Sequence, residues 1–364
     1  MKKYVTNKDI ATVYLYPSET TTALPFEPSN GIAAKFTGPG VTDTMAFKLA
    51  GKGRLNATWR KETYGYSLAE QYNYTTVTNH DGQYLTTSTS PHIYHRYSND
   101  ENGEHEACFT GETSDKRILA FNLSTKRNKM TSLSCYSPTT LSASCLCGMT
   151  SLKNIWSNSG KIASLEKNCL AGCTALTAVE LTCASQLKIN DNCLCGDTAL
   201  KNIKIKSSQY VSNVFGNSFA KGCTALTSVT LPKFNNAIGD QTTSQAPFYG
   251  CTSLQTLTLS ATNAGYLGGA VAHNCTSLTS FTLSGGCKCI NSGSIFDATT
   301  RNTLKNLTMN FSVAGMLSAS IISGSTSLTS VSLDNVKIAT TGAFKQNSAL
   351  RNVTLAGNVT SIAN

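Results

Sequence analysis

The sequence lacks any run of apolar residues that approaches the ~18 residues of a membrane-spanning helix. Charged residues are also scarce, at 14% of the chain, so Ser, Thr and Asn must cover most of the surface. The N-terminal segment MKKYVTNKDIATVYLYP begins with basic residues but lacks the apolar stretch of a secretory signal. We therefore expect no transmembrane segment, and the sequence as written carries no export signal.

Motifs of common enzymes are missing as well. The sequence contains no HExxH, no GxSxG and no phosphate-binding loop with GK[ST]. The segment GKGRLN at 51–56 lacks the third glycine of a dinucleotide-binding motif, and we interpret it as a turn. Acidic residues are too sparse in the later part of the chain for an obvious catalytic pair. We therefore expect a protein that is not an enzyme and needs no cofactor.

The charge that is present is unevenly distributed. Residues 1–128 hold 14 basic and 13 acidic residues, whereas the rest of the chain holds 16 basic and 7 acidic residues. The second part thus carries +9 of the formal net charge of +10. A basic excess favours acidic partners, but no nucleic-acid-binding motif and no interleaving of aromatic with basic residues accompany it. Nucleic acid is therefore not the expected partner.

One pattern recurs along most of the chain, as in GCTALTSVTL at 222–231 and GCTSLQTLTL at 250–259. Each copy has a pivot leucine, an apolar residue three positions later and another, usually leucine, five positions later. Alternation of apolar and polar residues is the period of a half-buried strand. The pivots, spaced 19 to 28 residues apart, are Leu133, Leu152, Leu176, Leu200, Leu226, Leu254, Leu278, Leu304, Leu328 and Leu350.

This spacing predicts a solenoid in which each repeat contributes one short strand to a parallel sheet. With strands ~4.8 Å apart, about ten coils would make a curved rod roughly 45 Å long. Residues 1–125 contain no copy of the repeat, and strand-like runs such as TVYLYP there indicate a small β-rich domain. We therefore predict two domains, 1–125 and 126–364, the second being the solenoid.

The recurring motif Gly-Cys-Thr-Ser-Leu, preceded by a pair such as Ala343-Phe344, resembles the BspA-like type of leucine-rich repeat found in bacterial surface proteins. Matching residues include 222–226 and 250–254, and the resemblance covers residues 130–364. It implies a right-handed leucine-rich-repeat solenoid with a parallel sheet on its concave face and no catalytic residues. It also implies adhesion or ligand binding at the cell surface, or secretion.

The 14 cysteines follow the repeat. Cys173, Cys223, Cys251 and Cys275 stand three positions before a pivot, in a slot that holds Met149 in another copy. A slot that accepts methionine indicates packing, and free cysteine buries readily as a small apolar residue. Strained disulfides between neighbouring coils are an alternative, because strand spacing lies within the Cα range of disulfides. Metal binding is another, suggested by CLC at 145–147 and 193–195, but paired CxxC spacing and nearby histidines are missing.

Four histidines, His80, His92, His95 and His105, gather among acidic residues in the first domain. His92 and His95 would lie on opposite faces of a strand, three residues apart. A solvated loop is the expected structure, with a metal site as the alternative.

A solenoid commonly binds its ligand on the concave face. There, alternation exposes the residues two, four and six positions after each pivot, which form a broad ribbon of hydroxyl and amide groups. Trp156 is its one large aromatic residue, and Lys204 with Lys206 forms a basic spot. An alternative is that Thr and Ser simply suit exposed strands, with Trp156 covered by the first domain. The candidate ligand-binding residues are Trp156, Glu180, Lys204, Lys206, Thr230 and Thr258.

We therefore expect a non-enzymatic binding or adhesion protein whose partner is a host or bacterial surface protein or glycan. The alternative is a structural spacer or assembly component, of an envelope or phage particle, attached through the N-terminal domain.

Overall fold

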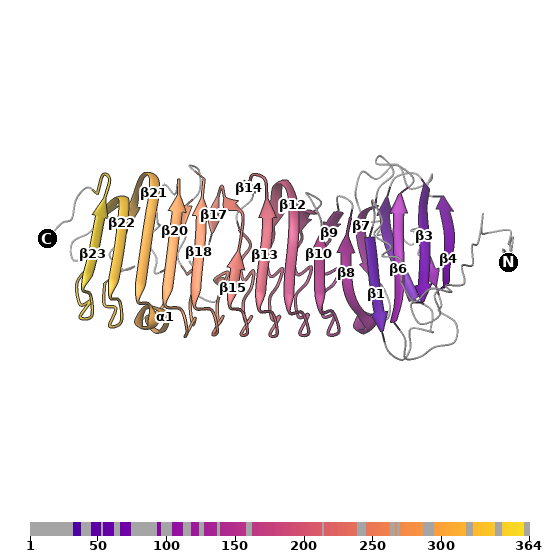
Figure 1. The fold of residues 1–364 in the computed structure, drawn as a ribbon, viewed down its shortest axis with the longest axis horizontal. Coiled ribbons are helices and arrows are strands. Elements are labelled where there is room, and N and C mark those ends of the chain that lie inside the picture. Colours follow the sequence, from indigo (N-terminus) through magenta and orange to yellow (C-terminus); the bar gives the residue numbers. More distant parts are fainter. Residues whose placement is uncertain are drawn as a thin grey trace.

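The protein is an elongated stack of β-strands in the computed structural model (Figure 1). The first described strands lie at one end of this rod and the last described strand lies at the other (Figure 1). The structure describes residues 32–37, 45–51, 54–61, 66–73, 93–95, 104–111, 118–123, 127–136, 139–157, 162–212, 215–238, 245–262, 266–267, 270–286, 295–317, 323–338 and 344–359.

The solenoid is built around one parallel sheet, to which each coil adds a strand after its pivot residue. Neighbouring strands pair in parallel, and β15 contacts β18. The strands are, in order, β8 (Met130–Cys135), β10 (Asn154–Ser157), β12 (Ala178–Ile189), β13 (Asn202–Ser207), β15 (Ser228–Thr230), β18 (Thr256–Ala261), β20 (Ser280–Gly285), β21 (Asn306–Leu317), β22 (Ser330–Ile338) and β23 (Asn352–Ala356).

The strand register corrects the first predicted pivot. Leu133 pairs with Ile155, the apolar residue three positions after Leu152, so Leu133 is not the pivot of its coil. The pivot position falls on Met130, which is fully buried. The prediction was wrong because Met130 is not a leucine, and methionine can fill an apolar slot that leucine occupies in other coils.

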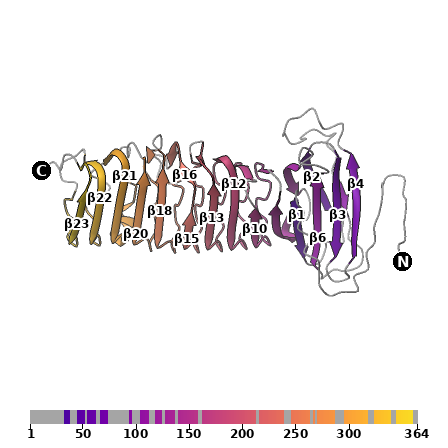
Figure 2. The ribbon, with the colours of Figure 1, turned by 45° about the horizontal axis from the view of Figure 1, so that its top comes forward.

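A second side of the solenoid is also extended chain. Short strands β9 (Thr139–Leu141), β11 (Ile162–Leu165), β14 (Tyr210–Val211) and β16 (Lys233–Phe234) pair in parallel with one another or with the ends of β12 and β18. Strands β17 (Ala237–Ile238) and β19 (Tyr266–Leu267) form a separate pair. Since both sides repeat at strand spacing, the rod curves little in Figures 1 and 2.

Helix is rare in the part of the chain that the structure describes. It consists of α1 (Ala298–Thr303), capped by the Asp297 side chain, and the 3-10 helix η3 (Arg127–Lys129). Neither is long and apolar enough to cross a membrane.

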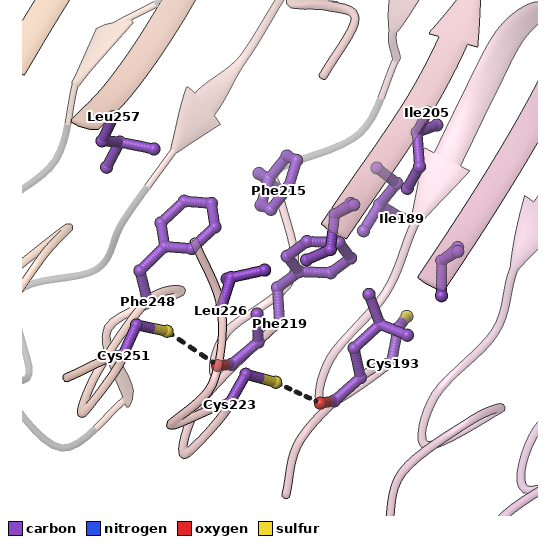
Figure 3. Packing of buried hydrophobic residues seen from close by; sticks show 14 of the residues in the cluster. Ile189, Cys193, Ile205, Phe215, Phe219, Cys223, Leu226, Phe248, Cys251 and Leu257 are labelled. Carbon is purple, nitrogen blue, oxygen red and sulfur yellow. Dashed lines mark hydrogen bonds between the residues drawn. The ribbon is translucent and has the colours of Figure 1, made fainter. Parts of the chain in front are cut away.

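The core contains the pivots and the apolar residues that the repeat pattern predicts. Ile155, Val179 and Ile203, for example, are at most 2% exposed. The cysteines of both predicted slots are buried and lie among apolar side chains, as Figure 3 shows for Cys193, Cys223 and Cys251. Packing is thus confirmed as their structural role. The eleven cysteines of the described residues are all free thiols there, and Cys108, Cys287 and Cys289 lie outside the described side chains.

The N-terminal region is β-rich, as predicted, and its strands pair mainly antiparallel. Strand β1 also pairs antiparallel with β8, so one sheet continues across the predicted boundary at 125/126 into the solenoid. The strands are β1 (Ile32–Thr37), β2 (Met45–Gly51), β3 (Arg54–Lys61), β4 (Tyr66–Asn73), β5 (Ile93–His95), β6 (Glu104–Gly111) and β7 (Ile118–Leu123).

Candidate ligand-binding face

The residues predicted to face outward line one side of the parallel sheet, which we call the polar face. It consists of the positions two and four after each pivot. These positions are half-buried or exposed on the described strands, whereas the apolar residues between them are almost all buried. Alternation therefore predicted correctly which side chains face solvent. The face contains the register rows that begin with Ser132 and with Ser134, which pair with Asn154 and with Trp156 on the next strand.

Four candidate residues lie side by side in one row of the polar face. The Cα register pairs Trp156 with Glu180, Glu180 with Lys204, and Lys204 with Thr230. Thr258 occupies the same position on the next strand, β18. The structure thus brings together, within a few strand spacings of ~4.8 Å each, residues that are up to 102 positions apart in the sequence.

Trp156 is half-buried beside Tyr136. The two rings meet edge to face, with centroids 5.5 Å apart and an interplanar angle of 67°. Such contacts stabilise a ring in one orientation, by about 0.5–1.5 kcal/mol beyond area burial. The ring that shields Trp156 comes from the residue after β8, in the first coil of the solenoid. The sequence pattern did not reveal Tyr136 because Leu133 was taken as the pivot of this coil; counted from Met130, Tyr136 stands six residues after the pivot, at a position that alternation leaves outside the core.

The predicted basic spot of Lys204 and Lys206 is altered by an ion pair. The Lys204 ammonium donates a hydrogen bond to the Glu180 carboxylate on the neighbouring strand. Both side chains are almost half exposed, and exposed pairs of this kind contribute only about 0–1 kcal/mol. The pair can therefore open when a ligand competes for either charge. Lys206 lies two residues after Lys204 on β13 and is exposed. Its register partner on β12 is Thr182.

A pocket of about 320 Å³ lies at the N-terminal end of this region. It is formed by β1, β8 and the start of β10, so both predicted domains contribute to it. Its lining contains two amines, three hydroxyls and one amide, from Lys35, Thr37, Thr131, Ser132, Lys153 and Asn154. The repeat pattern could not reveal this pocket, because Lys35 and Thr37 belong to a strand outside the repeats.

No cluster of three or more His, Cys, Asp or Glu side chains that could hold a metal occurs among the described residues. Of the four histidines considered above, His80 and His92 lie outside the described residues, as do the side chains of His95 and His105.

Two solved structures of repeat proteins are similar to this chain. One is the crystal structure of a leucine-rich repeat protein from Bacteroides ovatus ATCC 8483, with 13% identity, covering 68% of this chain and 88% of that chain, at a TM-score of 0.24. The other is a leucine rich cell surface protein from Faecalibacterium prausnitzii A2-165, with 13% identity, covering 61% and 84% of the two chains, at a TM-score of 0.21. No curated protein matches the chain.

The model of the BspA type leucine-rich repeat region matches residues 120–247, 240–314 and 294–364. It counts six copies, fewer than the roughly ten repeats predicted from leucine spacing. Because these matches cover well over half of the sequence, the chain belongs to the BspA-type leucine-rich repeat family.

Proposed function

We propose that this protein is a non-enzymatic binding protein that recognises a surface protein or glycan through the polar face of its solenoid. The observation that carries the proposal is the row of Trp156, Glu180, Lys204 and Thr230 on four neighbouring strands. An aromatic ring, two opposite charges and a hydroxyl are thereby offered to one ligand. Aromatic and basic residues of this kind often supply most of the energy of an interface.

The rigidity of the stack supports this role. Trp156, Glu180 and Lys204 lie on strands that pair with a strand on each side, and Thr230 lies on β15, which pairs with β13. The apolar residues of those first three strands that point into the core, Ile155, Val179 and Ile203, are at most 2% exposed. A preformed surface loses little conformational entropy on binding, so weak polar contacts add up to useful affinity. Family membership supports action at a bacterial cell surface, and we include adhesion in the proposal.

The test is a glycan and surface-protein array probed with the full chain and with the variant Trp156→Ala, Lys204→Ala, Lys206→Ala. Each anchor residue is expected to contribute about 1–2 kcal/mol, so the variant should bind its ligands at least about ten-fold more weakly. The matched control changes Thr282, Thr308 and Ser332 to Ala, which occupy the same row further along the rod. Equal binding by the wild-type and first-variant chains would refute the placement of the site.

A structural spacer is the second candidate function. The continuous pairing of β1 with β8 favours it, because this pairing joins the N-terminal region and the solenoid into one rod. If the protein is a spacer, the array should show no specific binding. The larger particle that contains the protein should then assemble normally with the variant Trp156→Ala, Lys204→Ala, Lys206→Ala.

A further inference from the structure

A row of basic residues runs along the edge of the polar face where the strands begin. Each stands directly after a pivot, and they recur in every second coil except one. All four are exposed, and none takes part in an ion pair in the described part of the chain. This basic row consists of Lys153, Lys201, Lys305 and Arg351. Gln255 stands where the missing member would be.

Threonines fill the same position in the coils between. The Thr177 amide donates to the Lys153 carbonyl at 3.0 Å, and the Lys201 amide donates to the Thr177 carbonyl at 2.9 Å. The Thr177 and Thr227 hydroxyls also donate to the carbonyls of the preceding coil, Lys153 and Lys201, at 3.3 and 3.2 Å. The threonine side chains are thus tied to the backbone, and the lysine ammonium groups are the charged groups that remain available to a ligand.

Strand spacing sets the distance between these charges. Coils stack about 4.8 Å apart, so neighbouring members of the row stand about 9.6 Å apart, or twice that across Gln255. From Lys153 on the coil of β10 to Arg351 on the coil of β23, the row extends about 38 Å. The edge on which it lies is the lower one in Figure 1, where strands β10 to β23 start.

No acidic side chain offsets this row among the described residues of the adjoining positions. The position two before each pivot is threonine in most coils, and the position two after it is Asn, Ser, Thr or Ala. Glu180, further along its strand, is already paired with Lys204. Part of the basic excess of the repeat region is therefore concentrated in one line, flanked by hydroxyl and amide groups.

The pocket described above lies at the N-terminal end of the basic row. Two of its lining residues, Lys153 and Thr131, stand directly after a pivot, as all members of the basic row do. Lys35 on β1 adds a second amine to the lining. In the register of β1 and β6, Glu106 is the Cα partner of Lys35. Glu106 is buried and is not among the residues that line the pocket. A chain lying along the row can thus place one end in a pocket of about 320 Å³.

We infer that the basic row binds a linear acidic polysaccharide. Charges repeating every ~9.6 Å match a polymer of alternating charged and neutral sugars better than duplex DNA, whose phosphates recur every ~3.4 Å along each strand. The adjoining positions offer hydroxyls and amides to sugar hydroxyl groups and, among the described residues, no aromatic ring on which bases could stack. This inference concerns a different row from that of Trp156 and does not depend on it.

The test measures binding of the full chain to hyaluronate, which carries a carboxylate on every second sugar, and to polygalacturonate, which carries one on every sugar. Dextran serves as the neutral polysaccharide and duplex DNA as the alternative polyanion. The variant Lys153→Gln, Lys201→Gln, Lys305→Gln should bind the acidic polysaccharide at least about ten-fold more weakly, with a shallower dependence on salt. These residues are exposed, so thermal unfolding of the variant should match that of the wild-type chain.

The matched control is Lys188→Gln, Lys233→Gln, Lys337→Gln, which removes three exposed lysines on strand segments away from the row. This control should bind within about three-fold of the wild-type chain, because net charge alone acts weakly over such distances. Equal losses in the two variants, tighter binding to DNA, or binding to neither acidic polysaccharide would overturn the inference. Trp156→Ala should leave this binding intact, which separates the inference from the proposed function.

Discussion

At the residue scale, the slot three positions before each pivot links one coil to the next. The thiols of Cys173, Cys223, Cys251 and Cys275 donate to carbonyls of the preceding coil at 3.0 to 3.2 Å. Figure 3 shows two of these bonds, from Cys223 and Cys251. The slot therefore suits a small side chain that can donate a hydrogen bond from a buried position. Cysteine meets this need without the cost of burying a charge.

One coil has Asp197 in this slot, and the side chain is fully buried. Its Oδ1 accepts a hydrogen bond from the Cys173 amide at 2.7 Å, whereas Oδ2 is buried without a hydrogen-bond partner. Desolvation raises the pKa of this carboxyl to about 8, although the backbone amides of Cys173 and Gly172 lower it in part. Asp197 is therefore mainly protonated at neutral pH in the folded chain.

This burial predicts that the protein loses stability as the pH rises from about 4 to about 8. Over that range the unfolded chain has already lost the Asp197 proton while the folded chain retains it, so each increase in pH favours unfolding. Asp197→Asn should remove this dependence, with a gain relative to the wild-type chain on the order of a few kcal/mol at pH 9. Urea unfolding at several pH values measures the effect.

Asp334→Asn provides the control, since Asp334 is half-buried on β22 and is not in this slot. Parallel pH profiles for Asp197→Asn and the wild-type chain would contradict the protonated state of Asp197.

At the scale of the repeat element, glycine in the Gly-Cys-Thr motif is required by the backbone. Gly222 has φ +75°, in the left-handed region, and a Cβ there would meet nothing closer than 4.0 Å. Space is therefore available, and the cost of a side chain is conformational. Asn274 takes this position two coils later with φ 55°, in agreement with the tolerance of asparagine for left-handed backbone.

Gly222→Ala is accordingly expected to lower the free energy of unfolding by about 1–2 kcal/mol. Gly222→Asn should cost clearly less, because its side chain resembles the one that already occupies the equivalent position in the coil of Asn274. Chemical unfolding of the two variants gives the comparison. Equal losses for alanine and asparagine would show that lost packing space, and not backbone conformation, decides the effect.

The repeat pattern predicted the strands, the buried pivots and the outward side chains, because these depend on local alternation that recurs in every coil. It misplaced the first pivot, since Met130 fills a leucine slot. It also missed contacts that arise between coils or outside the repeats. The Glu180–Lys204 pair, the Tyr136–Trp156 contact and the contribution of Lys35 to the pocket depend on register and on β1, which no single repeat encodes.

At the scale of the whole molecule, each coil depends on its neighbours to cover its apolar residues. On β12 and β22, which have a paired strand on each side, Val179 and Val331 are at most 1% exposed. On β23, the last strand that the structure describes, Val353 and Leu355 are 47% and 43% exposed. Stability in such stacks is approximately the sum of terms for each coil and for its interfaces. The coil of β23 is therefore expected to be less stable than the coils that have a neighbour on each side.

Val179 and Val353 hold the same position in their coils, three residues after the pivot, so they form a matched pair. Val179→Ala should lower the free energy of unfolding by about 2 kcal/mol, because it leaves a cavity in a packed interior. Val353→Ala should cost less than about 0.5 kcal/mol, since its side chain is already half in water. Amide hydrogen exchange should give the same ranking in the wild-type chain, with slower exchange in β12 and β13 than in β23. Equal losses for the two variants, with equal protection of these strands, would mean that the stack unfolds as a single unit and that its described end is no weaker than its middle.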